Sequence, residues 1–198
     1  LGENVLWTKK PVTQASDLEG MRIRMLLGPG EALSMLGATA VATPYTEAID
    51  LLQRGGVDGI STTFFDQGVR DGLGDVSDYV SSAGDMGVFA VMLTAIRKPV
   101  WESLDEQTQE IFNEEIAFAT ERYFASLDAT IDQAVDKLAE NEHIQIGEVS
   151  AEEAARWREL TQEQLHNNYI QRAQKVHADG QKLIEDFMAR IAEYEELY

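Results

Sequence analysis

The stretch "DLEGMRIRML" at residues 17–26 decides the fold, because it joins a turn to a strand with clear two-residue periodicity. Arg22 and Arg24 share one face of this strand, and the intervening apolar residues share the other. The surrounding chain is strongly acidic, with 35 Asp and Glu against 16 Lys and Arg and a formal net charge of −19. Two arginines inside an apolar strand of such a chain therefore need an explanation.

The residues that follow repeat a pattern of short strands and helices. We expect a helix over 29–37, an extended segment over 38–44, a helix over 45–55 with Thr46 as N-cap, and a buried strand within 57–65. The opening "NVLWT" also has the composition of a strand. This spacing predicts parallel strand–helix–strand units with right-handed crossovers. The expected architecture is α/β, with helices packed on a small parallel sheet.

The second half of the chain is helical in character. Apolar residues at three- and four-residue spacing predict one long helix or two in succession after Lys98. Ser150 and Glu153 have the spacing of a capping box at the start of a further helix. The other expected elements are an apolar strand over 86–97, a short edge strand over 143–149 and a last amphipathic helix over 179–198.

Composition excludes several classes of function. The excess of acidic residues disfavours nucleic acid and anionic membrane surfaces as partners, because both bind through clustered Lys and Arg. The absence of cysteine excludes disulfides, thiolate metal sites and cysteine nucleophiles. No apolar run reaches the roughly 18 residues of a membrane span. The sequence begins without Met inside a strand-like segment, which we interpret as a processed or truncated piece of a longer protein.

The residues show no catalytic or metal-binding arrangement. His143, His166 and His177 lie in polar helical segments and lack the spacing of metal ligands. The "GPGEA" at 28–32 is not followed by the Lys-Ser or Lys-Thr of a phosphate loop, and it does not form the GxGxxG motif of dinucleotide-binding proteins. We therefore expect no metal, no cofactor and no enzymatic activity.

Periodicity alone leaves two explanations of the arginines open. Tyr45 follows Pro44 where a strand gives way to a helix, and "STTFF" at 61–65 follows another strand. Open α/β sheets bind ligands at such positions, so Arg24 can be the charged group of a binding cleft there. The alternative is that both arginines offset part of the acidic excess at a sheet edge.

Several separate motifs resemble the solute-binding proteins of tripartite ATP-independent periplasmic (TRAP) transporters, the DctP-type family. The matching pieces are "DLEG" and "RIR" at 17–24, "LGA" at 36–38, Glu47, "LQ" at 52–53, "VDG" at 57–59, "KKPV" at 9–12 and "WESLDEQTQ" at 101–109. They occur in order over essentially the whole chain. The resemblance implies a periplasmic-binding-protein-like, two-lobed α/β fold, present here mainly as the second lobe with long bracing helices.

The same resemblance implies a division of the chain. Residues 1–87 and 128–198 would form the second lobe with its C-terminal helices, and residues 88–127 would cross into a first lobe that is mostly absent. The function implied is capture of a small organic acid outside the cytoplasm, in the periplasm, and its delivery to membrane permease subunits. The alternatives are a sensory module for an organic acid, and a small α/β enzyme, which lacks any supporting constellation. Long C-terminal helices also allow a homodimer.

The resemblance also assigns candidate ligand-binding residues. Arg24 matches the family arginine that forms a bidentate salt bridge with the solute carboxylate, whereas Arg22 is expected to have a surface or structural role. The other candidates are Tyr45, Thr62, Ser61, Phe64, Trp7 and Asn4. Asn4 stands where many relatives have a further arginine, and Thr62 where a ligand-contacting Asn often lies. One arginine fewer and more aromatic lining predict a small monocarboxylate with an apolar or hydroxylated body.

Overall fold

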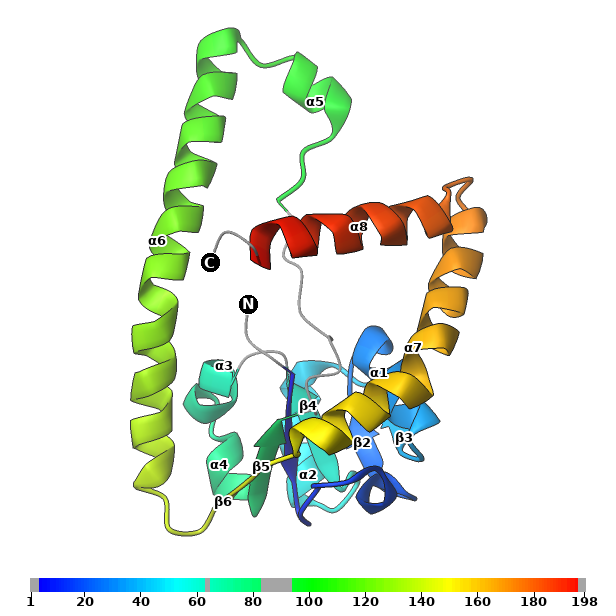
Figure 1. Cartoon of the computed structure of the whole chain (residues 1–198). Helices are drawn as coiled ribbons and strands as arrows, with labels where there is room; N and C mark the ends of the chain where they lie inside the picture. The colour runs from blue at the N-terminus through cyan, green and yellow to red at the C-terminus, as the bar shows by residue number, and fades with distance from the viewer. Residues whose placement is uncertain (1–3, 63–64, 83–93, 196–198) are drawn as a thin grey trace.

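The computed structural model describes residues 4–62, 65–82 and 94–195. Its centre is a six-stranded sheet with strand order β3-β2-β4-β1-β5-β6 (Figure 1). The strands are β1 (Val5–Thr8), β2 (Arg22–Arg24), β3 (Thr39–Val41), β4 (Gly59–Thr62), β5 (Tyr79–Ser82) and β6 (Gln145–Gly147). Five of these strands lie where the sequence predicts them, and β6 is the edge strand that the sequence indicates, but β5 falls in a stretch where a helix and turns were expected.

The sheet is mixed, which corrects the expectation of a wholly parallel sheet. β2 pairs in parallel with β3 and β4, and β5 pairs in parallel with β6. β1 lies between β4 and β5 and is antiparallel to both. The opening strand thus joins the two parallel groups, because its two free edges satisfy backbone groups of β4 and β5 that would otherwise be unpaired.

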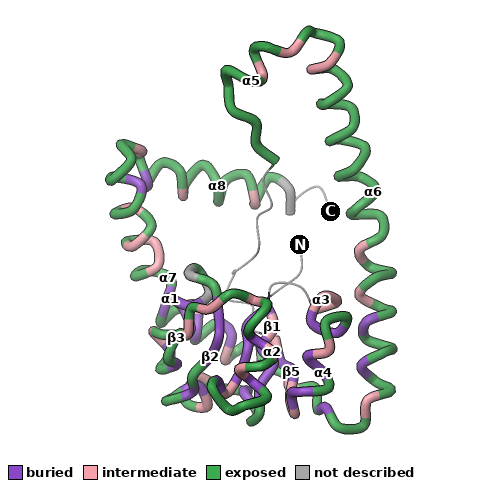
Figure 2. The backbone as a smooth tube through the Cα atoms, turned by 180° about the vertical axis from the view of Figure 1, so that it is seen from behind, coloured by how far each residue is buried: buried purple, intermediate pink, exposed green. Residues whose placement is uncertain are grey.

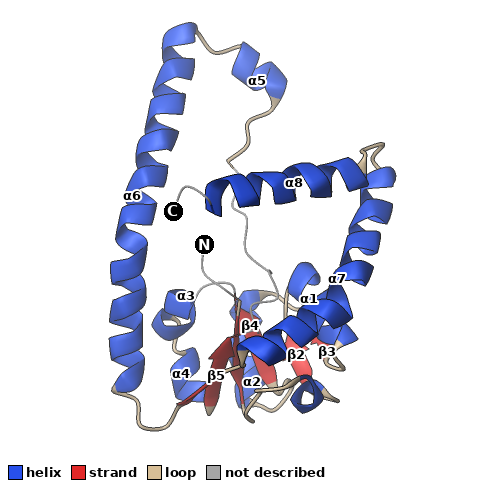
Figure 3. Cartoon of the chain, viewed as in Figure 1, coloured by secondary structure: helices blue, strands red, loops and turns tan. Residues whose placement is uncertain are grey.

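Helices cover both faces of the sheet, as Figure 3 shows. They are the 3₁₀ turn η1 (Ala15–Leu18) and the α-helices α1 (Leu27–Met35), α2 (Tyr45–Gln53), α3 (Phe65–Arg70), α4 (Leu73–Val76), α5 (Lys98–Glu102), α6 (Glu106–Ala139), α7 (Ala151–Gln174) and α8 (Gly180–Glu195). The architecture is α/β, as expected.

Two apolar cores result, one on each face. The first packs α2, α3, α4 and the C-terminal end of α6 around the fully buried Trp7 of β1 and Ile60 of β4. The second packs η1, α1 and α7 around Leu6, Ile23 and Trp157, which are also fully buried. Alternation along β1 explains this division, because Leu6 and Trp7 point to opposite faces.

The predicted helix at 45–55 is confirmed, but its start differs in detail. Pro44 is the N-cap residue, with φ −53° and ψ 144°, so Thr46 lies inside the first turn and caps nothing. Proline suits this position because its fixed φ is compatible with helix entry and an N–H there would form no hydrogen bond within the helix. Gly55 has φ +70° and ends the helix in the left-handed conformation that glycine tolerates, as the sequence indicates.

The long helix after Lys98 is continuous over 34 residues. Its N-cap, Asp105, accepts a 2.9 Å hydrogen bond from the Thr108 N–H. Ser150 caps α7 as predicted by accepting from the Glu153 N–H, but the Glu153 carboxylate does not return the bond. It contacts Ala15 and Trp157 instead. Of the strand predicted over 86–97, residues 86–93 lie outside the described residues, and 94–97 form no strand.

Helices α5 and α8 and the N-terminal part of α6 are much more exposed than the sheet and its covering helices, as Figure 2 shows. Both α5 and the N-terminal part of α6 extend away from the sheet, and α8 contacts chiefly α7 (Figures 1 and 2). Large apolar side chains are exposed along α6 and α8, among them Ile111, Phe112, Ile116, Phe118, Phe124, Leu183, Phe187 and Met188. The division at residues 88 and 127 stays a prediction. None of the helices in the described ranges has the length and apolar character needed to cross a membrane.

Candidate functional site

The predicted site residues gather at one edge of the sheet. This edge, which we call the upper edge, combines the carboxyl ends of β2 and β4 with the amino end of β1. Arg24 is the last residue of β2 and Thr62 the last of β4. Val5 pairs with Thr62, so Asn4 lies beside the same edge. The parallel pairing of β2 with β4 and the antiparallel pairing of β1 bring together residues far apart in sequence.

Arg24 is a buried guanidinium with few protein partners. Only 4% of the residue is exposed, and its Nε donates a 3.0 Å hydrogen bond to the Thr43 carbonyl. Its Cζ lies 5.3 Å from the centroid of the Tyr45 ring. Burial lowers the pKa of Arg24, and the Tyr45 hydroxyl opposes this shift. No carboxylate in the described part of the chain forms an ion pair with Arg24.

Arg22 has the opposite environment although it shares a strand face with Arg24. Its Nε and Nη2 each donate a 3.0 Å hydrogen bond to Asp58, and Nη2 also donates to the Gly55 carbonyl at 2.9 Å. The hydrogen bonds from Arg22 lower the pKa of the Asp58 carboxyl. The pair is solvent-exposed, with 45% of the Arg22 side chain accessible. This arrangement matches the structural role expected for Arg22.

Tyr45 lies between Arg24 and the core formed by α2 and α3. Its ring faces the Arg24 guanidinium, while its hydroxyl is buried and makes no hydrogen bond of acceptable geometry with any described residue. Burial first, and then the nearby Asp71 carboxylate, raise the pKa of the Tyr45 phenol well above its usual range. The phenol is therefore neutral at physiological pH.

Trp7 and Thr62 lie on the same face of the sheet and contact each other. The Trp7 Nε1 donates a 3.0 Å hydrogen bond to the Thr62 Oγ1, and Phe65 stacks on the Trp7 ring with centroids 5.8 Å apart. Trp7 is fully buried, and its contacts hold Thr62 and Phe65 against the core. Gly68 permits this packing, because a Cβ there would lie 2.6 Å from the Trp7 ring.

Asn4 and Ser61 form a separate polar pair. The Ser61 Oγ donates a 3.1 Å hydrogen bond to the Asn4 Oδ1, and both residues are buried. Alternation along β1 and β4 places this pair on the α7 face, opposite Trp7 and Thr62. The structure thus brings Arg24, Tyr45, Thr62 and Trp7 to one face, and Asn4 and Ser61 to the other. Phe64 lies outside the described residues.

Two residues of this edge were missed by sequence reasoning. Thr43 contacts Arg24 through its backbone carbonyl, which no side-chain pattern reveals. Phe65 is the second member of the aromatic pair in "STTFF", and nothing in the residue pattern favours it over Phe64.

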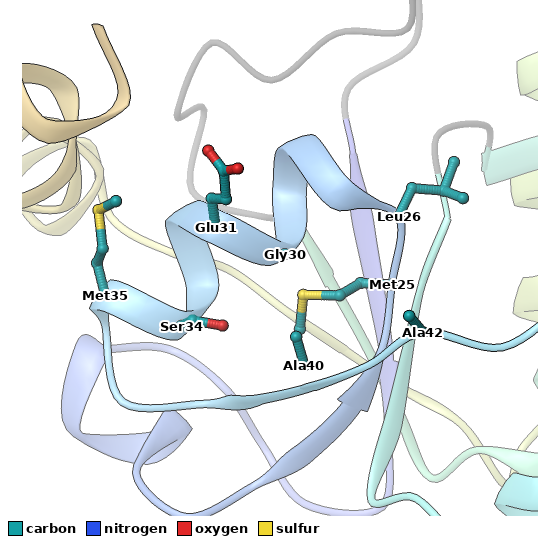
Figure 4. Close-up of a pocket in the computed structure, with 8 residues that line it drawn as sticks. All are labelled: Met25, Leu26, Gly30, Glu31, Ser34, Met35, Ala40 and Ala42. Carbon is teal, nitrogen blue, oxygen red and sulfur yellow. The ribbon is translucent and has the colours of Figure 1, made fainter. Parts of the chain in front are cut away.

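A cavity of about 410 Å³ lies elsewhere, between α1 and the segment that carries β3 (Figure 4). Its lining is mainly apolar and consists of Met25, Leu26, Gly30, Glu31, Ser34, Met35, Ala40 and Ala42. Glu31 forms an ion pair with Arg172 of α7. None of the predicted site residues lines this cavity. Across the described ranges, no group of three or more His, Asp or Glu side chains is arranged to hold a metal ion.

Comparison with known proteins identifies a family and relatives that match much of the chain. Residues 2–172 match the family described as bacterial extracellular solute-binding protein, family 7 (DctP). The ectoine-binding periplasmic protein TeaA of Halomonas elongata is 23% identical over 193 residues, which are 95% of this chain and 54% of TeaA. The ectoine/5-hydroxyectoine-binding periplasmic protein UehA of Ruegeria pomeroyi is 28% identical over 113 residues, which are 56% of this chain and 32% of UehA.

A solved structure has the same fold. The TRAP periplasmic solute-binding protein of Desulfovibrio salexigens with bound orotic acid superposes with a TM-score of 0.83 at 25% sequence identity. The match covers 97% of this chain and 60% of that protein. This chain thus spans about half the length of TeaA and about three-fifths of the orotic acid-binding structure.

Proposed function

This chain belongs to the bacterial extracellular solute-binding proteins of family 7, and from this premise we propose that it captures a small organic acid through the acid's carboxylate for a TRAP transporter. The observation that carries the proposal is the environment of Arg24. A buried guanidinium without an acidic partner among the described residues costs free energy of folding. A solute carboxylate would supply the missing counter-charge.

The geometry of Arg24 supports recognition of a carboxylate. The Arg24 Nε–H donates to the Thr43 carbonyl, which leaves the two Nη groups as donors to a solute. Two parallel N–H donors match the two oxygens of a carboxylate and fix the orientation of the ligand. Arg22 cannot serve as a second site of this kind, because Asp58 already occupies its fork.

The proposed solute is a monocarboxylate with a compact, partly apolar body. The buried Arg24 guanidinium lies over the Tyr45 ring, and Thr62 and Phe65 contact Trp7 on the same face of the sheet. TeaA and UehA bind ectoine, and the Desulfovibrio salexigens protein holds orotic acid. Both ligands are ring compounds that carry one carboxylate. They are therefore the first candidates for this chain.

The proposed setting follows from the family. The protein would act in the periplasm as a binding protein rather than an enzyme and would hand its solute to membrane permease subunits. Because the chain spans only part of its relatives' length, the remaining contacts to the solute would come from the rest of the protein. Neither the sensory alternative nor a homodimer is favoured by a specific observation.

Isothermal titration calorimetry on the full gene product tests the proposal. The probes are ectoine, 5-hydroxyectoine, orotate, benzoate and malate, with benzamide as a neutral analogue of benzoate. We expect saturable binding of at least one monocarboxylate, loss of at least about 100-fold in affinity with Arg24→Gln, since a charge-assisted bidentate pair is removed, and unchanged affinity with Arg22→Gln. Unchanged affinity in Arg24→Gln, or saturable binding of benzamide as tight as that of benzoate, would refute the carboxylate site.

A further inference from the structure

The contacts of Arg24 come from a single short segment. Thr43 supplies the carbonyl that accepts from Nε, and Tyr45 supplies the ring that lies 5.3 Å from Cζ. Pro44 stands between them and caps α2. Its ring restricts φ, which limits the backbone freedom between the carbonyl on one side and the aromatic residue on the other.

From this arrangement we infer that Tyr45 is a positioning residue, which holds the Arg24 guanidinium in the orientation that receives the solute and does so through the face of its ring. The inference rests on the proposed function and deepens it. It also changes the sequence-based expectation, in which Tyr45 contacts the ligand itself.

The position of the Tyr45 hydroxyl supports this role. The hydroxyl is buried, and the carboxylate that affects its pKa is that of Asp71, an exposed residue just after α3. The ring, in contrast, faces Arg24. Tyr45 therefore presents its π-face to the cation while its hydroxyl is buried near another protein group, which is the geometry of a cation–π support.

Two constraints together define the orientation of the guanidinium. The hydrogen bond from Nε to Thr43 fixes one edge of the planar group, and the ring of Tyr45 supports one of its faces. The remaining Nη groups are then held in place before the solute arrives. Preorganisation of this kind raises affinity, because less side-chain freedom is lost on binding.

Three variants of the full gene product test the inference, with ectoine, orotate and benzoate as probes. Tyr45→Phe retains the ring and removes the hydroxyl, so we expect affinity within about twofold of the wild type. Tyr45→Leu removes the ring, and we expect roughly a 5- to 30-fold loss in affinity, the equivalent of a partly desolvated cation–π contact. Ile49→Ala is the packing control, because Ile49 is on the same helix as Tyr45 and packs against the same core. It should leave the affinity unchanged.

A second measurement reports on Arg24 directly. The Nε–H resonance of Arg24 in ¹⁵N NMR, assigned by its loss in Arg24→Lys, should exchange slowly with solvent in the wild type and in Tyr45→Phe. It should exchange faster in Tyr45→Leu, and not in Ile49→Ala. An equal loss of affinity in Tyr45→Phe and Tyr45→Leu would overturn the inference, since the hydroxyl would then contact the solute. Unchanged affinity and exchange in Tyr45→Leu would overturn it as well. Failure of the wild type to bind any carboxylate would instead refute the proposed function.

Discussion

Glu153 in the first turn of α7 accepts a 2.7 Å hydrogen bond from the backbone N–H of Ala15, which lies 138 residues earlier in the chain. The same Oε1 accepts a 2.7 Å hydrogen bond from the Nε1 of Trp157. One carboxylate oxygen therefore joins the start of η1 to the most deeply buried aromatic residue of α7. This contact fixes α7 against the sheet face that carries Ile23.

Replacing this carboxylate should make the fold less stable and change its response to acid. Hydrogen bonds from Ala15 first, and then from Trp157, hold the pKa of the Glu153 carboxyl below its ordinary value of 4.5. A lowered folded-state pKa contributes stability that is present above the unfolded-state value and is lost as pH falls through the folded-state value. Urea unfolding should show a lower midpoint for Glu153→Gln at pH 7, and a weaker decline in stability below about pH 4.5.

Glu152→Gln is the matched control, because it removes the same charge from the same turn and Glu152 makes no hydrogen bond or ion pair with a described residue. Its unfolding midpoint and acid response should be close to those of the wild type. Equal effects of the two substitutions would show that charge in the first turn, and not the contact with Ala15, stabilises α7.

Adding one methyl group at Gly68 should destabilise the protein. A Cβ at this position would lie 2.6–2.7 Å from three atoms of the buried Trp7 indole, so the ring or α3 must move. Overpacking of this kind costs about 1–3 kcal/mol of the free energy of unfolding. Gly28→Ala in α1 is the control, since a Cβ there meets nothing within 4 Å and alanine has the higher helix propensity. Thermal unfolding that ranks Gly68→Ala at or above Gly28→Ala would contradict this packing.

Local pattern predicted much of the fold because several elements are determined by their own residues. The alternation in β2, the stop at Gly55 and the cap at Ser150 depend on neighbours within a few positions, and each is found where the sequence indicates. The direction of β1 depends on pairing with Thr62 and Ser82, far along the chain. Periodicity carries no information about such partners, which is why a parallel sheet was the wrong expectation.

The candidate site was predictable to a lesser degree for a related reason. Periodicity put Arg22 and Arg24 on one face, and the family motif distinguished their roles. The two arginines differ in their partners, which lie far along the chain. Arg22 pairs with the Asp58 carboxylate, whereas Arg24 donates a hydrogen bond to the Thr43 carbonyl. Every residue has a backbone carbonyl, so the residue type at position 43 does not indicate that its carbonyl accepts a hydrogen bond from Arg24. The separation of Ser61 from Thr62 onto opposite faces was available from strand alternation, but only once the bounds of β4 were known.

Buried residues at the C-terminal end of α6 should contribute more to the free energy of unfolding than exposed residues of the same helix do. Leu138 is 3% exposed and belongs to the same core as Leu73, whereas Val135 on the same helix is 42% exposed. Leu138→Ala should lower the free energy of unfolding by about 2–4 kcal/mol, through lost burial and the cavity that remains. Val135→Ala should change it by less than about 0.5 kcal/mol, as expected for an exposed site. Urea denaturation of both variants measures the difference. Similar losses of unfolding free energy in the two variants would show that Leu138 does not hold α6 against the core.

Arg24 should be less favourable for stability than an apolar residue of similar length. Its guanidinium is buried, and in the described residues its protein contacts are one neutral carbonyl and one aromatic ring. Neither contact supplies the counter-charge that offsets desolvation of a cation. Arg24→Met keeps an unbranched, flexible side chain and removes the charge, so the free energy of unfolding without solute should be unchanged or higher by about 1–2 kcal/mol.

The same substitution should abolish stabilisation by the solute. Ligand that binds only the folded state raises the melting temperature by mass action, so wild-type protein with excess ectoine, orotate or benzoate should melt at a higher temperature than without it. Arg24→Met should show no such shift with any of the three. Arg22→Met is the matched variant on the same strand: it should lose up to about 1 kcal/mol with the exposed Asp58 pair and keep the full ligand response. A large loss of stability in Arg24→Met, together with a retained melting shift, would mean that Arg24 stabilises the strand and that another group binds the carboxylate.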